Sequence, residues 1–271
     1  MAYRDRRVVA IVQARMGSSR LPGKVMRPLA GRTVLAHVLD RVEAMELVDE
    51  VVVATSEAGA DDRLAAWLQE RRGVMVVRGD EEDVLERYYQ AVMEVGVGAE
   101  VVVRITGDSP LVCIPWVQRG VKMLVDRQVE GVDLSTEATG MTRGFGAGVY
   151  TARAVIDAHL LARKAEEREH VTLFIKRHRS AFEVIAPPAS AELRTGYRLT
   201  LDYEEDYQVL RRLYEALYRR GKPIDCREAV RWLEAHPQVA GLNAHRGQRR
   251  VGKEDEDHPK LRPPPFWSAR W

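Results

Sequence analysis

Short apolar runs alternate along the first half of the chain with longer stretches in which apolar residues recur at helical spacing. The runs of strand length occupy residues 8–12, 50–55, 74–78 and 100–105. A stretch with helical periodicity follows each run, at residues 33–45, 61–72, 83–95 and 114–127. Strands and helices that alternate at this spacing predict an α/β fold with a mostly parallel sheet and helices on both faces.

The second half of the chain has a less regular pattern. It predicts strands at residues 132–134, 146–150, 182–185 and 197–201, and helices at 151–161, 166–178, 207–220 and 227–236. The apolar periodicity ends near Gly241, where basic residues, four consecutive acids at 254–257 and the prolines at 259 and 263–265 begin. This composition predicts a disordered tail at residues 241–271.

Length, charge and cysteine content narrow the class of protein. A chain of 271 residues is long enough for one large α/β domain with a sizeable core. The formal net charge of +2 makes nucleic acid an unlikely partner for the whole chain. Two cysteines, Cys113 and Cys226, suit a reducing compartment without disulfides. No apolar run approaches the roughly 20 residues of a membrane span, and the polar residues 1–7 do not look like a signal peptide, so we expect a cytoplasmic protein.

The segment that follows the first predicted strand carries the strongest chemical signal. It interleaves small residues with cations, in the order Gln13, Ala14, Arg15, Gly17, Ser18, Ser19, Arg20, Gly23, Lys24. Glycines and hydroxyls let backbone and side-chain donors approach a ligand closely, and the cations add charge. The spacing differs from a P-loop, because five residues separate Gly17 from Gly23 and Val25 replaces the Ser/Thr that binds Mg²⁺. The segment therefore predicts a polyphosphate site of another kind.

Two aspartates follow predicted strands and are candidate metal ligands. Asp108 lies in a Thr-Gly-Asp-Ser-Pro turn, and Asp202 follows residues 197–201. Ligands of parallel sheets bind beyond the carboxyl ends of the strands, where Lys24 and Asp108 should also meet. Mg²⁺ prefers a few carboxylates together with phosphate oxygens and waters. A helix N-cap or turn role explains Asp108 equally well, and so does an N-cap role for Asp202 in the helix at 207–220.

Several motifs, in order along the chain, resemble the CMP-sugar synthetase-like cytidylyltransferases, and most of all those of spore-coat polysaccharide biosynthesis. The resemblance covers about residues 8–217 and is carried by the segments 13–24, 51–56, 78–88, 104–110, 167–172 and 198–202. It implies a Rossmann-like nucleotide-diphospho-sugar transferase fold over residues 1–240. The nucleotide would bind in the half formed by about residues 1–130, and the acceptor and dimer contacts would lie in about residues 131–240.

The resemblance also implies an activity and a role for each motif residue. The expected reaction transfers CMP from CTP to a sugar, sugar acid or phosphorylated acceptor for surface glycan synthesis, with Mg²⁺ as cofactor, pyrophosphate as product and a homodimer as the assembly. The expected catalytic residues are Arg15, Lys24 and Asp108, and the metal ligands are Asp108 and Asp202. The expected nucleotide contacts are Gln13, Ala14, Arg15, Gly17, Ser18, Ser19, Arg20, Lys24, Thr55, Arg78, Asp83, Arg104 and Asp108. The expected acceptor contacts are Arg143, Arg168, His170 and Arg198.

One departure from the family pattern and two competing functions stay open at this point. Close relatives often carry acids where this chain has Gly146 and Gly148, and the two glycines would make room for a bulkier acceptor. A sugar-nucleotide-dependent glycosyltransferase shares the broad fold, although it usually has an Asp-x-Asp where this chain has Gly107-Asp108-Ser109. A non-catalytic nucleotide-binding protein is the other alternative, because the two glycines replace residues that the family uses.

Overall fold

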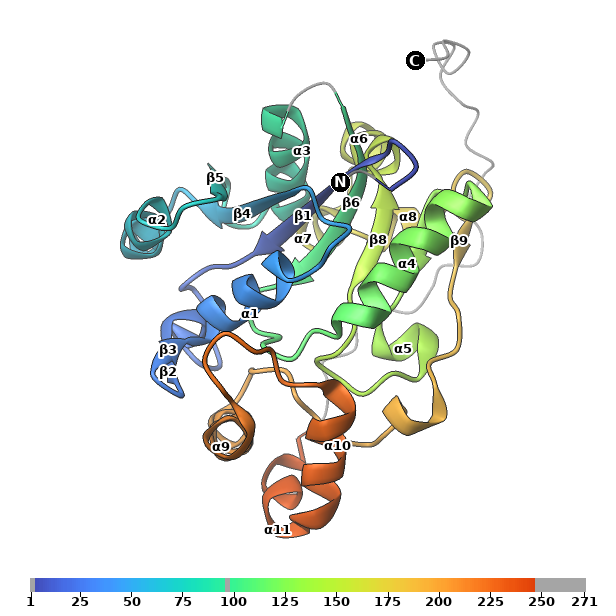
Figure 1. Ribbon diagram of the computed structural model, residues 1–271. Coiled ribbons are helices and arrows are strands. Elements are labelled where there is room, and N and C mark those ends of the chain that lie inside the picture. The colour runs from blue at the N-terminus through green and yellow to red at the C-terminus, as the bar shows by residue number, and fades with distance from the viewer. Residues whose placement is uncertain (1–2, 96–97, 247–271) are drawn as a thin grey trace.

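A seven-stranded sheet forms the centre of the computed structural model, which describes residues 3–95 and 98–246 (Figure 1). The strand order is β5-β4-β1-β6-β8-β7-β9. The strands are β1 (Arg7–Gln13), β4 (Glu50–Ser56), β5 (Val74–Gly79), β6 (Ala99–Thr106), β7 (Gly131–Asp133), β8 (Gly148–Thr151) and β9 (Val184–Ile185). A short hairpin, β2 (Pro28–Leu29) and β3 (Arg32–Thr33), lies outside this sheet.

The sheet is mostly parallel, as the sequence predicts. Strand β1 lies between β4 and β6 and is parallel to both, and β5 continues the parallel part beyond β4. Strand β8 is antiparallel to both β6 and β7. All five central residues of β1 are buried, because helices cover both faces of the sheet at this position. This is why the strand is a continuous apolar run rather than an alternating one.

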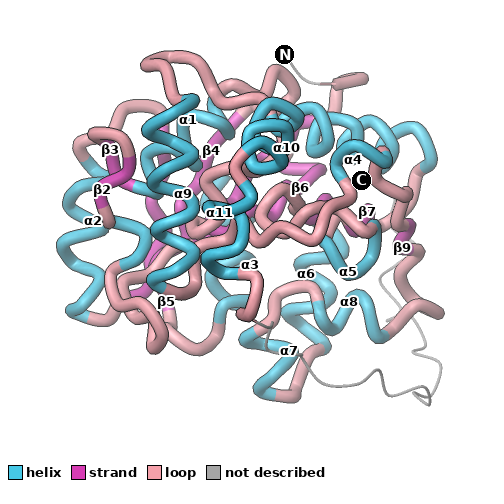
Figure 2. The backbone as a smooth tube through the Cα atoms, turned by 90° about the horizontal axis from the view of Figure 1, so that it is seen from below, coloured by secondary structure: helices cyan, strands magenta, loops and turns pink. Residues whose placement is uncertain are grey.

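Two layers of helices pack against the two faces of the sheet (Figures 1 and 2). Helices α1 (Val34–Glu43), α2 (Asp62–Gln69), α4 (Ile114–Arg127), α9 (Glu204–Leu217) and α10 (Cys226–Ala235) contribute to one hydrophobic cluster. Helices α3 (Val84–Val95), α6 (Ala152–Leu161) and α8 (Leu173–Arg177) contribute to the other. Short helices complete the described chain, namely α5 (Thr136–Thr139), α7 (Ala165–Glu169) and α11 (Pro237–Ala240).

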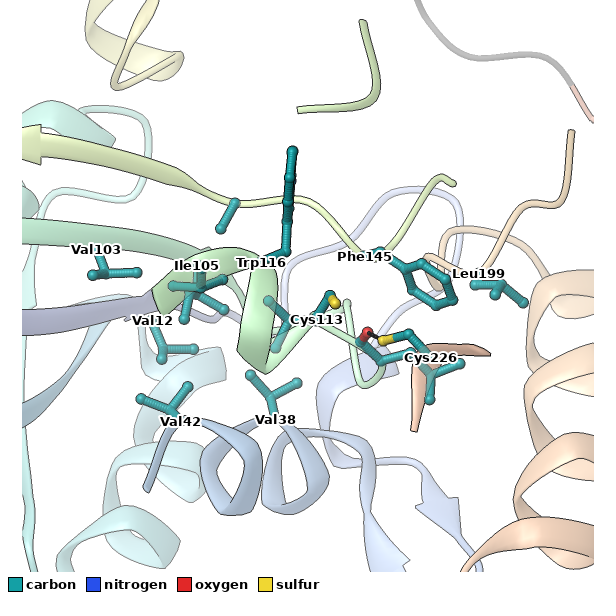
Figure 3. Packing of buried hydrophobic residues seen from close by; sticks show 14 of the residues in the cluster. Val12, Val38, Val42, Val103, Ile105, Cys113, Trp116, Phe145, Leu199 and Cys226 are labelled. Atoms are coloured by element: carbon teal, nitrogen blue, oxygen red, sulfur yellow. Dashed lines mark hydrogen bonds between the residues drawn. The ribbon is translucent and has the colours of Figure 1, made fainter. Parts of the chain in front are cut away.

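The larger cluster joins the central sheet to the C-terminal helices. Figure 3 shows Trp116 and Phe145 in this cluster, with Leu199 and Cys226 close to Phe145. Cys113 and Cys226 are both free and buried, so each acts as a small apolar side chain and the described chain has no disulfide. The segments that carry the predicted site therefore rest on one continuous core.

Three sequence predictions about secondary structure need correction. The helix predicted at 166–178 is broken into α7 and α8, with His170 outside both. Residues 197–201 do not form a strand, since only one isolated bridge joins Arg143 and Arg198 there. The start of the predicted tail is also ordered, because Gly241–Asn243 forms a 3₁₀ turn and Asn243 is buried. The rest of that tail, residues 247–271, lies outside the described residues.

The described helices are all too short or too polar to cross a membrane.

Candidate active site

The loop after β1 is folded back on itself by backbone hydrogen bonds. The Gly23 N–H donates to the Met16 carbonyl at 2.9 Å, and Gly23 adopts a left-handed φ of 68°. The buried Asp61 accepts a hydrogen bond from the Met16 N–H at 2.6 Å. Ser18 closes a smaller turn, because its hydroxyl accepts from the Leu21 N–H at 3.3 Å. The loop therefore has a defined shape before any ligand binds.

Gly107 brings the Asp108 turn against the start of this loop. Its N–H donates to the Gln13 carbonyl at 2.8 Å. A Cβ at this position would lie 2.9 Å from the Ala14 Cβ, which is closer than real Cβ atoms approach. Only glycine therefore lets the end of β6 approach the end of β1 this closely.

Asp202 reaches the same place through backbone contacts of the preceding residues. The Leu201 N–H donates to the Asp108 carbonyl at 2.9 Å, and the Leu199 N–H donates to the Arg143 carbonyl at 2.9 Å. Gly144 makes the second contact possible, because its Cβ would lie 2.4 Å from the Leu199 backbone. These contacts place Asp202 beside Asp108, although the two residues are far apart in the sequence.

Asp206, rather than Asp202, satisfies the backbone at the start of α9. The Asp206 carboxylate accepts from the N–H groups of Asp202 and Tyr203, both at 2.9 Å. Asp108 is not a helix N-cap either, because Cys113 occupies that position before α4. Neither predicted metal ligand therefore caps a helix, although Asp108 does lie in the turn that the Ser109 N–H closes on the Thr106 carbonyl.

Lys24 lies between the two aspartates. Its Nζ donates to Asp108 Oδ2 at 2.5 Å and to Asp202 Oδ1 at 2.9 Å. Arg20 also pairs with Asp202 Oδ1, at 2.7 Å, and Arg198 pairs with Asp202 Oδ2, at 2.6 Å. The Lys24 side chain is only 12% exposed, so the ion pairs are shielded from water. The structure thus gathers Arg20, Lys24, Asp108, Asp202 and Arg198 into one charged cluster.

The pKa values of Lys24 and Asp108 reflect this pairing. Burial lowers the pKa of Lys24, but the attraction of Asp108 and Asp202 and the hydrogen bonds to both outweigh it, so the pKa is raised above 10.5. Burial raises the pKa of Asp108, but Lys24 outweighs burial and lowers the pKa below 3.8. Both groups are therefore charged throughout the neutral range.

The donor set around Asp108 and Asp202 suits a metal that takes most of its ligands from a substrate. Among residues 3–95 and 98–246, no group of three or more His, Cys, Asp or Glu side chains is placed to hold a metal ion. Two carboxylates that face one cation form an incomplete oxygen site. Phosphate oxygens and waters would have to complete it, which is the usual arrangement for Mg²⁺.

Several predicted nucleotide contacts lie on the β4–β5 side of the loop. Arg15 approaches Glu81 at 3.4 Å, and the Cβ position of Gly17 faces the same carboxylate. Arg78 donates to the Ser56 carbonyl at 2.9 Å and pairs with Asp62 at 2.6 Å. The Thr55 hydroxyl is buried without a hydrogen-bond partner. Ser19 is exposed on the loop, whereas Ala14 is buried beneath it.

The four predicted acceptor contacts fall into two groups. Arg143 and Arg198 are neighbours through a parallel bridge, and Arg143 pairs with Glu137 at 2.9 Å. Arg168 lies elsewhere, on α7, where it pairs with Asp83 and also approaches Glu86. Asp83 and Arg168, which the sequence analysis assigns to different substrates, therefore bind each other. His170 follows α7 in the same region.

The two glycines at usually acidic positions do not make room for a larger acceptor. A Cβ on Gly146 would lie 2.5 Å from the Leu134 carbonyl oxygen. A Cβ on Gly148 would lie 2.7 Å from Cε2 of Tyr150, whose ring covers that position. The expectation of extra space is therefore wrong, because backbone and the Tyr150 ring already fill it.

Three supporting residues were not found by the sequence analysis. Asp61 holds the loop after β1 in place by accepting from the Met16 N–H, and Asp206 pairs with Arg198 at 2.9 Å. Asn243 donates to the Arg198 carbonyl at 2.9 Å and to Asp206 at 2.8 Å. Asp61 and Asp206 lie near the starts of predicted helices. An acidic residue at such a position is normally interpreted as a helix cap, so the sequence does not indicate their contact with the site. Nothing in the sequence indicates a role for Asn243, since it falls in the tail that is predicted to be disordered.

Comparison with known proteins agrees with this geometry. Residues 9–225 match the family model described as cytidylyltransferase. The chain is 34% identical over 239 residues to a spore coat polysaccharide biosynthesis protein, SpsF, of Bacillus subtilis, which covers 86% of this chain and 96% of that protein. It is 32% identical over 254 residues to an uncharacterized protein of Methanocaldococcus jannaschii, covering 92% of this chain and all of the other.

A solved structure shows the same fold. It is a cytidylyltransferase from Leptospira borgpetersenii, with a TM-score of 0.80 and 26% sequence identity, over 90% of this chain and all of that one. The family match spans most of the chain and includes the loop after β1, both aspartates and the segments that join them. This chain therefore belongs to the cytidylyltransferase family.

Proposed function

We propose that this cytidylyltransferase transfers CMP from CTP to a sugar, sugar acid or phosphorylated sugar for surface polysaccharide synthesis. The observation that carries the proposal is the position of Lys24 between Asp108 and Asp202, directly beside a small-residue loop. Cations next to paired carboxylates suit a reaction in which a metal-bound triphosphate is split. The relation to the spore coat polysaccharide protein supports the surface-polysaccharide role.

The residues present fit a divalent ion, for which Mg²⁺ is the best candidate. Asp108 and Asp202 would each supply a carboxylate oxygen, and the triphosphate and waters would supply the remaining ligands. When bound, such an ion neutralises phosphate oxygens and holds them in place. Lys24 faces both carboxylates, so it would be the residue that moves its hydrogen bonds toward the phosphates when nucleotide binds.

The remaining steps follow from the positions of the cations. An acceptor oxygen attacks the α-phosphorus of CTP, and the bond from that phosphorus to the oxygen that bridges it to the β-phosphate breaks, so that pyrophosphate leaves. Where the nucleophile is a hydroxyl, it loses its proton to solvent. Arg15, Arg20 and Lys24 lie along the loop, where they would stabilise the negative charge that develops on pyrophosphate. Asp108 belongs to the catalytic set as a carboxylate that positions both Lys24 and the metal. A homodimer stays a prediction.

The decisive experiment measures pyrophosphate release with CTP, ATP, GTP and UTP, with and without Mg²⁺, over a panel of sugars, sugar acids and sugar phosphates. We expect release with CTP and Mg²⁺ and one class of acceptor. Lys24→Met and Asp108→Asn should each lower kcat by about 10²- to 10³-fold, because the first removes a positive charge aimed at the transition state and the second removes the carboxylate that positions Lys24 and the metal.

Lys122→Met, on the exposed face of α4, is the matched control and should keep wild-type turnover. Near-normal turnover in Lys24→Met and Asp108→Asn would contradict the proposed site. Glycosyl transfer from a sugar nucleotide without pyrophosphate release would favour a glycosyltransferase instead. CTP binding without turnover on the whole panel would favour a non-catalytic protein.

A further inference from the structure

We propose that Arg104, Lys176 and Tyr150 form an anion-binding pocket that receives the carboxylate or phosphate group of the acceptor. The proposal rests on the proposed function, because it names the part of the acceptor that this enzyme recognises. The pocket differs from the set Arg143, Arg168, His170 and Arg198 that the sequence analysis gives for this role, and it moves Arg104 from the expected nucleotide contacts to the acceptor contacts.

Arg104 differs from the other predicted site cations because it has no partner within the described chain. Its Nε is buried without a hydrogen bond, and no carboxylate or carbonyl of residues 3–95 or 98–246 pairs with its guanidinium. By contrast, each of the other arginines and the lysine in the predicted site pairs with a carboxylate, namely Arg15, Arg20, Lys24, Arg78, Arg143, Arg168 and Arg198. A half-buried guanidinium whose Nε has no partner can bind an anion without first breaking an internal ion pair, and it gains a hydrogen bond by doing so.

The sheet register places a residue without a side chain beside Arg104. Gly148 on β8 pairs with Arg104 on β6, and it also pairs with Asp133 on β7. Residues that are directly opposite each other in antiparallel strands project from the same face. Arg104 and Asp133 thus flank a residue that has no side chain, and within the described chain Asp133 pairs with Lys176 and not with Arg104.

Tyr150 covers this glycine with its ring and hydroxyl. Its ring lies over Gly148, and its hydroxyl oxygen would lie 3.4 Å from a Cβ at that position. The side chain is 1% exposed, and its hydroxyl makes no hydrogen bond of good geometry within the described chain, although the Thr172 side chain lies close enough to lower its pKa. A buried hydroxyl that is poorly paired is unfavourable, so an anion beside Arg104 would gain a hydrogen bond from it.

Lys176 supplies a second cation from α8. It pairs with Asp133 at 2.8 Å. Burial lowers the pKa of Lys176, but Tyr150 and Asp133 together outweigh burial, so the pKa is raised. Arg104 acts in the opposite direction and lowers it. Burial and Asp133 raise the pKa of Tyr150, while Lys176, the Thr172 side chain and Arg104 oppose that rise. Arg104 is opposite the glycine that Tyr150 covers, and together with Lys176 and its partner Asp133 these side chains carry a net charge of +1.

The position of the pocket points to the acceptor rather than the nucleotide. Strand β6 separates β8 from β1, and β1 leads into the loop that is proposed to hold the triphosphate. Arg104 lies two residues before Thr106, at the carboxyl end of β6, where Asp108 follows. An anion bound by Arg104 and Tyr150 would therefore lie on the β8 side of the reacting phosphate.

The test uses the full-length protein saturated with CMP and three probes, glucuronate, glucose 1-phosphate and glucose, with binding measured by calorimetry. We expect wild type to bind one of the two anionic sugars and not glucose, which distinguishes a carboxylate from a phosphate acceptor. Arg104→Met should weaken that binding at least about tenfold, since it removes a charged hydrogen-bond donor. Tyr150→Phe should weaken it about threefold, and the Kd for CTP should be unchanged in both.

Arg104→Lys keeps the charge but loses the planar donor pair, so it should recover part of the affinity. Arg231→Met, at an exposed position of α10, is the control and should bind as wild type does. The proposal is overturned if Arg104→Met weakens CTP binding instead, if it leaves the sugar affinity intact, or if wild type binds neither anionic sugar.

Two results separate this pocket from the proposed function. If an anionic sugar binds through Arg104 but no nucleotide yields pyrophosphate, the pocket stands and the proposed transfer fails. If pyrophosphate is released with glucose at equal rates in wild type and Arg104→Met, the transfer stands and the pocket is overturned.

Discussion

At the scale of single residues, Lys24 holds together two carboxylates that would otherwise repel each other. The folded pKa of Asp108 lies below 3.8, so its contribution to stability is complete above that pH and is lost as the pH falls through the folded value. The folded pKa of Lys24 lies above 10.5, so its contribution is complete below pH 10.5 and is lost as the pH rises through the folded value. The pairing is therefore intact across the neutral range.

Removal of Lys24 should change how stability depends on pH. In Lys24→Met, burial would raise the pKa of Asp108 without opposition from the ammonium, so protonation of Asp108 would relieve the strain of a buried charge. We expect the variant to be about 2 kcal/mol less stable than wild type at pH 7. This difference should become smaller as the pH is lowered to 4.

Urea unfolding at pH 7, 5.5 and 4 measures the difference directly. The double variant Lys24→Met/Asp108→Asn should lose most of the pH dependence, since Asp108 can no longer titrate. A difference that stays constant or grows on acidification would contradict the assignment of Lys24 as the counter-ion of Asp108.

At the scale of elements, Gly144 controls the segment that carries Asp202. Gly144→Ala would place a Cβ 2.4 Å from the Leu199 backbone at a φ of +95°. The matched control is Gly221→Ala, which has a φ of +78° and open space around the Cβ position. The control should cost about 1 kcal/mol from backbone strain alone. Gly144→Ala should cost about 1–3 kcal/mol more, because the segment around Leu199 must move.

Thermal or urea unfolding of both variants gives these costs, and CTP turnover shows whether Asp202 has moved. Turnover should fall in Gly144→Ala and stay at the wild-type level in Gly221→Ala. Equal costs in the two variants would mean that the contact with Leu199 is not needed.

Strands β1, β4, β5 and β6 and helices α1 to α4 could be predicted, because burial imposes a regular apolar pattern on their sequences. Parallel strands that are covered on both faces are continuous apolar runs, and their helices have one apolar side. Residues 197–201 show the limit of this rule, because Leu199 and Leu201 are fully buried without being part of a strand. The pattern reports burial and does not report the hydrogen bonds that define a strand. The break at His170 has no Pro or Gly to mark it.

At the scale of the whole molecule, the C-terminal segment supports the site from outside the sheet. Asn243 fills a buried position, where it binds both Arg198 and Asp206. Asn243→Ala should therefore leave buried polar groups unpaired and cost about 2 kcal/mol in unfolding free energy. His245→Ala, at an exposed position two residues later, should change stability by less than about 0.5 kcal/mol.

Chemical denaturation of the two full-length variants checks this prediction. Because Arg198 holds Asp202, the Asn243 variant should also bind CTP more weakly in the presence of Mg²⁺. A stability loss of the same size in both variants would show that Asn243 has no special role.

The candidate site could be predicted in part. The loop after β1 and the turn at Asp108 follow neighbouring strands, and the expected approach of Lys24 to Asp108 is present in the structure. The contact between Leu201 and Asp108 joins distant segments by a backbone hydrogen bond, and no side-chain pattern encodes it. The sequence also does not show that Arg104 is unpaired, because this depends on which residues of β8 and β7 lie beside it in the folded sheet.

The central place of β1 has a consequence for the order in which the chain can fold. Strand β1 is made first, but its two neighbours, β4 and β6, begin only at residues 50 and 99. Pairings between such distant segments form slowly, because a long loop must close before they gain any contact energy. A growing chain therefore exposes an apolar strand until β6 has been synthesised, and chaperones that bind extended apolar segments have that interval in which to act.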